Sequence, residues 1–307
     1  MIVDNPNISV IIPAYNAAET ISTSLRSALS SHLVVEVIVV DDASRDSTQE
    51  IVRNIADKDQ RVVLLTREAN SGPAAARNMA LEKARGEYIA ILDADDFFLP
   101  GRLEKIATFI RSYDFVADDL LFCRTMNGPI YPRNLFVAPR KQIGFTEFIA
   151  ANVIDPRSHR RELGFLKPVM SKQFLLDNNL RYDETLRLGE DYAFYARALL
   201  VGARFVLVEA LGYVALERPD SISAQHTIED LQALWTFDRD LLKTLRVPSE
   251  YHAVMTHMNV TKDRLQLRRF LEAKTNHKYS HMLRQFFQSS RTANYIAREI
   301  IRLKLGF

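Results

Sequence analysis

The chain has 307 residues, of which 47% are hydrophobic and 25% are charged, as in globular proteins with one large domain or two modest ones. Its net charge is +2, but residues 260–307 hold eleven Lys or Arg and three Asp or Glu, so the rest of the chain is acidic. The single cysteine, Cys123, excludes an intrachain disulfide and suits a reducing compartment. No stretch resembles a signal peptide or approaches the ~20 apolar residues that span a bilayer, so we expect a cytoplasmic protein.

The first hundred residues alternate between apolar runs and segments with helical periodicity. The predicted strands cover residues 8–12, 35–40, 62–65 and 88–92, and the predicted helices begin near residues 21, 47, 74 and 102. Pro13 is expected to end the first strand, and Ser47 with Glu50 has the pattern of a capping box. Repeated strand–helix units predict a parallel sheet with helices on both faces.

The second half of the chain is less regular. A strand is predicted over residues 115–122, an irregular loop over 127–140, an extended segment over 164–170 and a short helix over 171–179. Further strands are predicted at 204–208 and 213–216, and a long amphipathic helix over 227–245 begins a basic helical region. We therefore predict an α/β protein with a doubly wound, mostly parallel, Rossmann-like sheet in residues 1–225 and a C-terminal helical extension in residues 226–307.

Acidic or polar residues follow three of the predicted strands. They are Pro13 to Asn16 after the first strand, Asp41 and Asp42 after the second, and Asp93, Asp95 and Asp96 after the fourth. Ligands bind outside the carboxyl ends of strands in such sheets, and closely spaced carboxylates favour a cation with oxygen ligands such as Mg²⁺ or Mn²⁺. The alternative is that these acids only cap helices.

Features of anion binding accompany these acids. Arg77 follows Gly72 and Pro73 in the first turns of a predicted helix, where backbone N–H groups and a guanidinium both suit anions. No G-x-G-x-x-G follows the first strand and no G-x-x-x-x-G-K-[ST] occurs. A dinucleotide dehydrogenase and a P-loop kinase are therefore disfavoured, and a nucleoside diphosphate held through a metal fits better.

Five motifs in this order resemble the inverting GT-A glycosyltransferases of family 2. They are Pro13-Ala14-Tyr15-Asn16, Val40-Asp41-Asp42-Ala43-Ser44, Asn70-Ser71-Gly72-Pro73 with Arg77-Asn78, Asp93-Ala94-Asp95-Asp96 and Gly189-Glu190-Asp191. The resemblance covers roughly residues 7–225. Within the family, the chain is similar to glucosyltransferases that extend succinoglycan-type exopolysaccharide units. The resemblance implies a GT-A fold.

The resemblance also implies roles for individual residues. In the donor site, Pro13 and Tyr15 would line the base pocket, Asp42 would hold uracil, Arg77 would lie near the nucleotide and Asp93 would approach the ribose. Asp95 would coordinate Mg²⁺ or Mn²⁺ on the diphosphate, with Asp96 in support. Asp191 would be the general base that deprotonates the acceptor hydroxyl, and Glu190 would orient the acceptor.

The activity implied by the resemblance is transfer of a sugar, with glucose expected, from a UDP-sugar to a growing, lipid-linked exopolysaccharide acceptor. A sugar nucleotidyltransferase is an alternative, disfavoured because Pro13 to Asn16 contains neither glycine nor a cation. A non-catalytic nucleotide- or glycan-binding protein is a second alternative, and the joint presence of Asp42, Asp95 and Asp191 argues against it. We expect no nucleic-acid partner, since the basic C-terminal region lacks a paired aromatic platform.

Two features leave alternatives open. In residues 296–307, apolar residues alternate with Arg298, Arg302 and Lys304. This amphipathic basic helix either lies on the inner face of an anionic membrane or packs on its own domain. His226 is either a ligand for the metal or diphosphate when a loop closes, or an ordinary exposed histidine.

Overall fold

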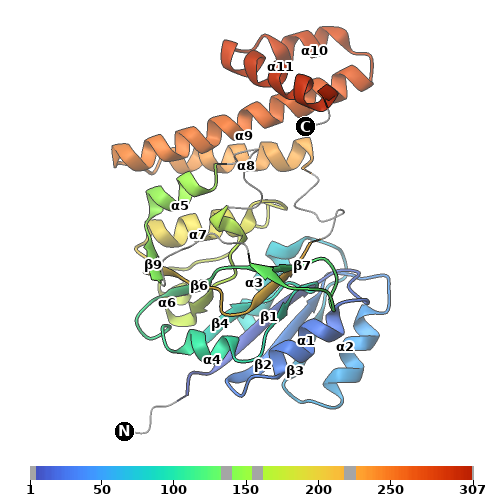
Figure 1. The fold of residues 1–307 in the computed structure, drawn as a ribbon, viewed down its shortest axis with the longest axis vertical. Coiled ribbons are helices and arrows are strands. Elements are labelled where there is room, and N and C mark those ends of the chain that lie inside the picture. The colour runs from blue at the N-terminus through green and yellow to red at the C-terminus, as the bar shows by residue number, and fades with distance from the viewer. Residues whose placement is uncertain (1–4, 133–139, 154–161, 218–225, 306–307) are drawn as a thin grey trace. The chain divides into compact units, whose positions relative to one another are not determined.

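The computed structural model describes residues 5–132, 140–153, 162–217 and 226–305 (Figure 1). They belong to two compact units, which we treat separately. The first unit comprises Met1–Phe145 and Leu163–Pro219, and the second comprises Thr146–Glu162 and Asp220–Phe307. The expected domain boundary at residues 225 and 226 adjoins residues outside the description and stays a prediction.

An eight-stranded sheet forms the centre of the first unit (Figure 1). Its order is β3-β2-β1-β4-β10-β6-β11-β9, in which β10 is antiparallel to both neighbours, β9 is antiparallel to β11 and the other pairs are parallel. The bounds are β1 (Ile8–Ala14), β2 (Val34–Asp41), β3 (Val62–Thr66), β4 (Tyr88–Ile91), β6 (Phe115–Asp118), β9 (Arg140–Ile143), β10 (Val169–Ser171) and β11 (Phe205–Val208). The predicted α/β class and mostly parallel sheet are confirmed.

Helices connect the strands of this sheet. They are α1 (Ile21–Leu29), α2 (Thr48–Ala56), α3 (Pro73–Lys83), α4 (Arg102–Ala107), α6 (Lys172–Asp177) and α7 (Glu190–Leu200), with a 3₁₀ turn η1 (Leu163–Phe165). The chain passes from β1 to β2 and β3, and then returns to β4 on the other side of β1. Right-handed connections therefore place α1 and α2 on one face, where Figure 1 shows them side by side, and α3 on the other. The reversal between β1 and β4 is the point at which such sheets bind ligands.

A smaller sheet follows β4 along the chain. Its order is β5-β12-β7-β8, formed by β5 (Phe97–Phe98), β7 (Leu121–Cys123), β8 (Tyr131–Pro132) and β12 (Tyr213–Leu216). The single strand predicted over residues 115–122 is therefore wrong, because β6 and β7 belong to different sheets. The chain leaves the first sheet at Asp118, whose fully buried side chain binds Arg102 and three backbone N–H groups.

Three other local predictions are wrong. Pro13 does not end β1; it pairs with Val40, and its missing N–H costs no bond because pairing with β4 has already ended near Ile11. The Ser47 side chain makes no capping bond, and the preceding Asp46 accepts from both the N–H and the hydroxyl of Thr48 (3.0 and 2.6 Å). Residues 164–170 also begin with the η1 turn rather than extended chain.

The second unit is helical. It contains α5 (Phe145–Ala151), α8 (Ile228–Leu242), α9 (Pro248–Thr275), α10 (Tyr279–Phe286) and α11 (Ser290–Leu305). The first residue of α5, Phe145, still belongs to the first unit. The helix predicted over 227–245 is α8, which begins with a capping box between Thr227 and Asp230. Buried Asp238 on α8 meets His257 on α9 at 2.7 Å. The predicted helical extension is confirmed, and none of the described helices is long and apolar enough to cross a membrane.

Candidate active site

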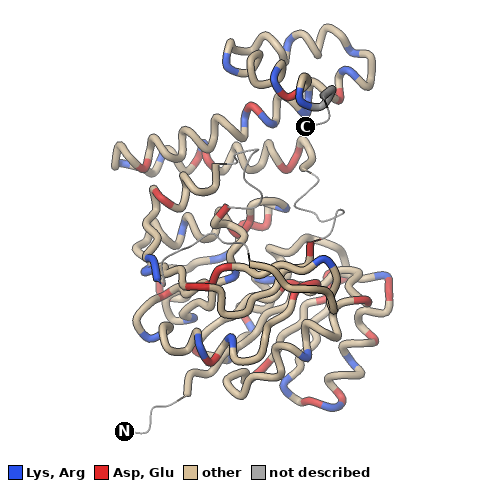
Figure 2. The backbone as a smooth tube through the Cα atoms, in the orientation of Figure 1, with Lys and Arg blue, Asp and Glu red and all other residues tan. Residues whose placement is uncertain are grey.

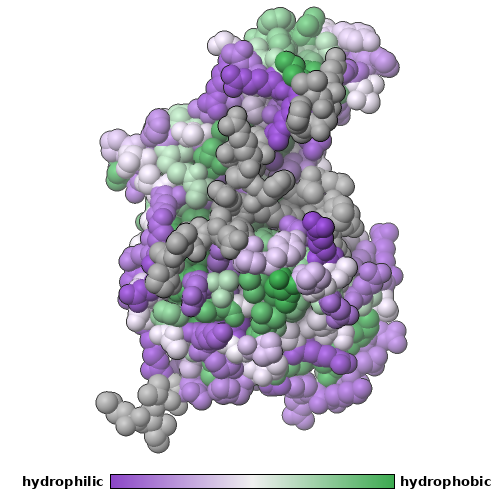
Figure 3. Space-filling view, in the orientation of Figure 1, coloured by the Kyte–Doolittle hydropathy of each residue, from purple (hydrophilic) through white to green (hydrophobic). Residues whose placement is uncertain are grey.

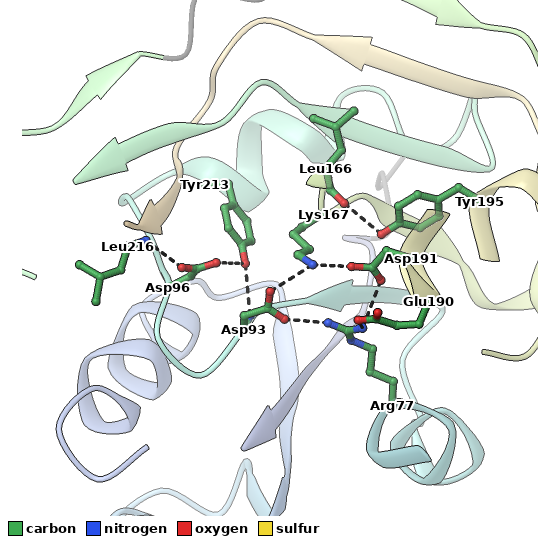
Figure 4. Close-up of polar contacts among 10 residues, drawn as sticks. All are labelled: Arg77, Asp93, Asp96, Leu166, Lys167, Glu190, Asp191, Tyr195, Tyr213 and Leu216. Atoms are coloured by element: carbon green, nitrogen blue, oxygen red, sulfur yellow. Dashed lines mark hydrogen bonds and ion pairs between the residues drawn. The ribbon is translucent and has the colours of Figure 1, made fainter. Parts of the chain in front are cut away.

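Two cations and three carboxylates meet at the carboxyl end of β4 (Figure 4). Arg77 contacts Asp93 (2.9 Å), Glu190 (2.8 Å) and Asp191 (3.2 Å), while the Lys167 Nζ contacts Asp191 (2.5 Å) and Asp93 (3.1 Å). We call these five residues the charge cluster. They come from α3, the turn after β4, the segment before β10 and the first turn of α7. With all five groups ionised, the cluster carries one net negative charge.

Burial makes these ion pairs strong and mutually dependent. The side chains of Arg77, Lys167 and Asp191 are at most 9% exposed, and that of Asp93 is 28% exposed. Burial disfavours the charged form of Asp93, but the attraction of Lys167 and Arg77 outweighs it and lowers the pKa of Asp93 to about 2. Burial and the neighbouring charge of Asp191 raise the pKa of Glu190. Removal of either Arg77 or Lys167 would therefore leave the three carboxylates of the cluster with a single cation.

Local sequence explains how the helices present these groups. Gly189 has a left-handed φ of 76° and turns the chain into α7, so Glu190 and Asp191 occupy the first turn, where carboxylates interact favourably with the helix dipole. Arg77 lies in α3, which begins after Gly72 with its φ of 89°. The Arg77 guanidinium also lies over the Tyr182 ring, 5.3 Å from its centre.

Asp96 is held by the smaller sheet. Its buried carboxyl accepts hydrogen bonds from the Tyr213 hydroxyl (2.7 Å) and the Leu216 N–H (2.9 Å). The Tyr213 oxygen in turn accepts from the Asp93 N–H (3.2 Å). Burial, followed by the charges of Asp95 and Asp93, raises the pKa of Asp96 well above its usual range. Both oxygens of Asp96 are thus used in fixing the turn after β4.

Asp42 lies beneath the loop that precedes α3. It is 3% exposed and accepts from the N–H groups of Ser71 (3.0 Å) and Gly72 (2.7 Å), with Arg67 at 3.2 Å. A pocket of about 530 Å³ adjoins this region, lined by Tyr15, Ala43, Ser44, Arg45, Arg67, Glu68, Ala69 and Asn70. Tyr15 is 46% exposed, so its ring is available to a bound ligand. Arg45, Arg67 and Glu68 together give the pocket lining one net positive charge.

The structure thus places the predicted site residues in different parts of the first unit. Arg77, Asp93, Glu190 and Asp191 meet in the charge cluster, whereas Tyr15 lines the pocket and Pro13 belongs to the end of β1. The roles assigned to these residues stay predictions. His226 is half-buried in the second unit, and its role as a ligand also stays a prediction.

No sequence motif identifies Lys167 as a site residue. The available signal is a lysine within the otherwise apolar run Leu166-Lys167-Pro168-Val169-Met170. A lysine in such a run is buried only when a carboxylate pairs with it. No sequence pattern states which carboxylate that is.

The residues at the turn after β4 fit a metal held largely by a substrate. Among the residues that the structure describes, no group of three or more His, Cys, Asp or Glu side chains is arranged as metal ligands. Magnesium and manganese in phosphate sites need only one or two carboxylates in addition to phosphate oxygens. The half-buried Asp95 can supply one such carboxylate.

Comparisons with known proteins show the family of this chain. Residues 9–167 match the family model described as glycosyl transferase family 2. The chain is 40% identical over 274 residues to succinoglycan biosynthesis protein ExoU of Rhizobium meliloti (strain 1021), covering 87% of this chain and 79% of that protein.

Two solved structures share the fold. S. aureus TarS 1-349 in complex with UDP-GlcNAc has a TM-score of 0.64 at 20% identity, covering 94% of this chain and 92% of that one. The mannosyltransferase PcManGT from Pyrobaculum calidifontis, in complex with GDP-Man and Mn²⁺, has a TM-score of 0.60 at 19% identity, covering 98% and 81%. These similarities confirm the predicted GT-A fold, and the match to the family model together with the similarity to ExoU shows that the chain belongs to glycosyltransferase family 2.

Proposed function

We propose that this chain is a metal-dependent, inverting glycosyltransferase of exopolysaccharide synthesis. Its donor would be a UDP-hexose, with glucose the expected sugar, and its acceptor a lipid-linked oligosaccharide. The observation that carries the proposal is the charge cluster, in which the Asp191 carboxylate is held beside Asp93, two residues from Asp95. This arrangement supports Asp191 as the proposed base acting beside the proposed donor-side carboxylates. Family membership favours sugar transfer over the nucleotidyltransferase alternative.

The donor assignment is supported by the pocket beside Asp42. Its volume of about 530 Å³ suits a small ligand, Tyr15 offers an aromatic face to a base, and Arg45 and Arg67 attract an anion. TarS in complex with UDP-GlcNAc and PcManGT in complex with GDP-Man and Mn²⁺ support a nucleotide sugar and a divalent cation. The similarity to ExoU supports a role in exopolysaccharide synthesis.

The proposed reaction is one displacement at the anomeric carbon. The bond to the acceptor oxygen forms as the bond to UDP breaks, and Asp191 takes the proton of the acceptor hydroxyl. Lys167 and Arg77 each contact a different oxygen of Asp191, and each oxygen has a second lone pair that can accept this proton. A bound divalent cation, held through Asp95, would stabilise the charge that develops on the leaving diphosphate.

Replacement of Asp95 tests the donor site. Asp95→Asn is expected to lower the metal-dependent affinity for UDP by about tenfold or more, because an amide is a weaker ligand for a hard cation than a carboxylate. Calorimetric titration of UDP with Mn²⁺ and with a chelator measures the difference. The exposed Asp177→Asn is the matched control. If Asp95→Asn kept the wild-type response to Mn²⁺, the metal assignment would be wrong.

Peripheral contact with an anionic membrane is part of the proposal, but the structure changes which residues support it. Ile296 on α11 is fully buried, so part of the predicted amphipathic helix packs within its own unit. Side chains of residues 303–307 lie outside the description. On α10 and its end, Tyr279, Leu283 and Phe287 are 58%, 50% and 72% exposed. Their spacing of four residues places them along one helix face.

Charge near this apolar face suits an anionic surface. Residues 273–298 contain five Lys or Arg and no Asp or Glu. Figure 2 shows the cations along α10 and α11, and Figure 3 shows apolar surface among hydrophilic surface at this end of the unit. Exposed apolar side chains with nearby cations are typical of helices that lie on anionic membranes.

A paired substitution tests the membrane contact. Leu283→Asp with Phe287→Asp is expected to weaken binding to phosphatidylserine-containing vesicles by about tenfold or more, because it removes apolar contact and adds negative charge. Vesicle sedimentation measures the effect. Leu176→Asp, at a 62% exposed leucine of the first unit, is the control. Equal sedimentation of the paired variant and wild type would reject this surface.

A further inference from the structure

Lys167 joins two carboxylates that come from different parts of the fold. Its Nζ lies 3.1 Å from Asp93 Oδ2, in the turn after β4, and 2.5 Å from Asp191 Oδ2, on α7 (Figure 4). The side chain is 9% exposed. One buried ammonium group therefore bridges the carboxylate on the donor side and the proposed base, both of which Arg77 also contacts, at 2.9 and 3.2 Å.

The backbone around Lys167 is fixed from two sides. The carbonyl of Leu166 accepts a hydrogen bond from the Tyr195 hydroxyl (3.0 Å), and Tyr195 lies on α7, one turn after Asp191. The carbonyl of Lys167 accepts from Arg102 Nη2 (3.1 Å), and Arg102 is paired with Asp118. A lysine side chain is flexible by itself, but burial and these contacts limit the positions that its ammonium can reach.

We infer that Lys167 is a positioning residue for sugar transfer, holding Asp191 at a fixed distance from the bound donor. The inference rests on the proposed function. Without the ammonium, the ion pair that Asp191 retains among the described residues is the longer one to Arg77 (3.2 Å), and the net charge of the cluster would change from −1 to −2. Asp93 would keep Arg77 at 2.9 Å. Loss of Lys167 should therefore displace the base more than the donor-side carboxylate.

Substitutions of Lys167 separate charge from packing. Lys167→Met is expected to lower kcat about 10²-fold, since a displacement of about 1 Å in a catalytic group has effects of this size. UDP affinity with Mn²⁺ should stay within about threefold, so the loss appears in kcat rather than in donor binding. Lys167→Arg restores a cation with different geometry and should be about tenfold more active than Lys167→Met.

A purely structural role predicts the opposite order. Methionine is neutral, unbranched and close to lysine in length, so a packing role would favour Lys167→Met over the larger Lys167→Arg. The control is Lys172→Met, because the Lys172 Nζ binds a backbone carbonyl, that of Ala84 (2.7 Å), outside the charge cluster. Its kcat should stay within about threefold of wild type.

The outcomes distinguish this inference from the proposed function. An inactive wild-type chain would refute the proposed function. With an active wild type, the inference is overturned if Lys167→Met keeps wild-type kcat, if it exceeds Lys167→Arg, or if it loses UDP binding as severely as activity. Circular dichroism checks folding. If Lys167→Met does not fold, Lys167→Arg decides alone: a kcat about tenfold below wild type with unchanged UDP affinity supports the inference, and wild-type kcat overturns it.

Discussion

Replacement of Asp191 with asparagine is expected to lower sugar transfer by about 10²–10⁴-fold while UDP binding stays within about threefold of wild type. An amide has nearly the same shape but cannot take the proton of an acceptor hydroxyl. Arg77 still holds Asp93 at 2.9 Å in this variant, so the donor side of the charge cluster keeps a cation. Transfer is measured as product formed per enzyme, and UDP binding by calorimetry.

The matched control is Asp183→Asn. Asp183 also pairs with an arginine, Arg197 at 2.7 Å, and it lies outside the charge cluster. This variant should transfer sugar at a rate within about threefold of wild type. Normal transfer by Asp191→Asn would reject the base assignment, whereas equal loss of binding and transfer would place Asp191 in the donor site.

Replacement of Asp118 with asparagine is expected to lower the free energy of unfolding by about 3–5 kcal/mol, because it leaves the buried Arg102 without its counter-charge. Both side chains are fully buried. Asp118 accepts from Arg102 Nε and Nη2 (3.0 and 2.6 Å) and from the N–H groups of Leu211, Gly212 and Tyr213 (3.1 to 3.2 Å). The pair therefore ties α4 and β6 to the start of β12, and urea unfolding followed by circular dichroism measures its contribution.

A partly exposed pair provides the comparison. Asp114 pairs with Arg204 at 2.9 Å, and the side chains of Asp114 and Arg204 are 14% and 56% exposed. Asp114→Asn should cost about 0–1 kcal/mol, since exposed salt bridges contribute little. If Asp118→Asn cost no more than Asp114→Asn, the Arg102–Asp118 pair would not be the structural support that its burial indicates.

Local sequence patterns were sufficient to predict the strands of the first half of the sheet. Residues 37–40 before Asp41 and residues 88–92 before Asp93 form apolar runs because β2 and β4 are covered on both faces, and such runs have few other interpretations. The same pattern placed Asp93 at a strand end. No single motif predicts that Asp93, Arg77 and Asp191 lie together. The five motifs in order imply a shared site through the family resemblance, and in the structure Arg77 contacts both carboxylates.

Features that depend on distant partners could not be predicted. Asp118 lies within the single strand predicted over residues 115–122, and only the fold reveals Arg102 as its buried partner. Lys167 lacks a motif because its two partners lie 74 residues before it and 24 residues after it in the sequence. Ile296 belongs to an amphipathic pattern that suits both a membrane and a protein surface, and its burial shows packing within the second unit.

The central claim is inverting transfer from a UDP-sugar. The most direct measurement is the anomeric configuration of the sugar that the purified chain transfers from an α-linked UDP-hexose, with Mn²⁺, to a lipid-linked oligosaccharide. Nuclear magnetic resonance of the product distinguishes the two configurations. The single displacement assisted by Asp191 predicts a β-linked sugar. An α-linked product would contradict it.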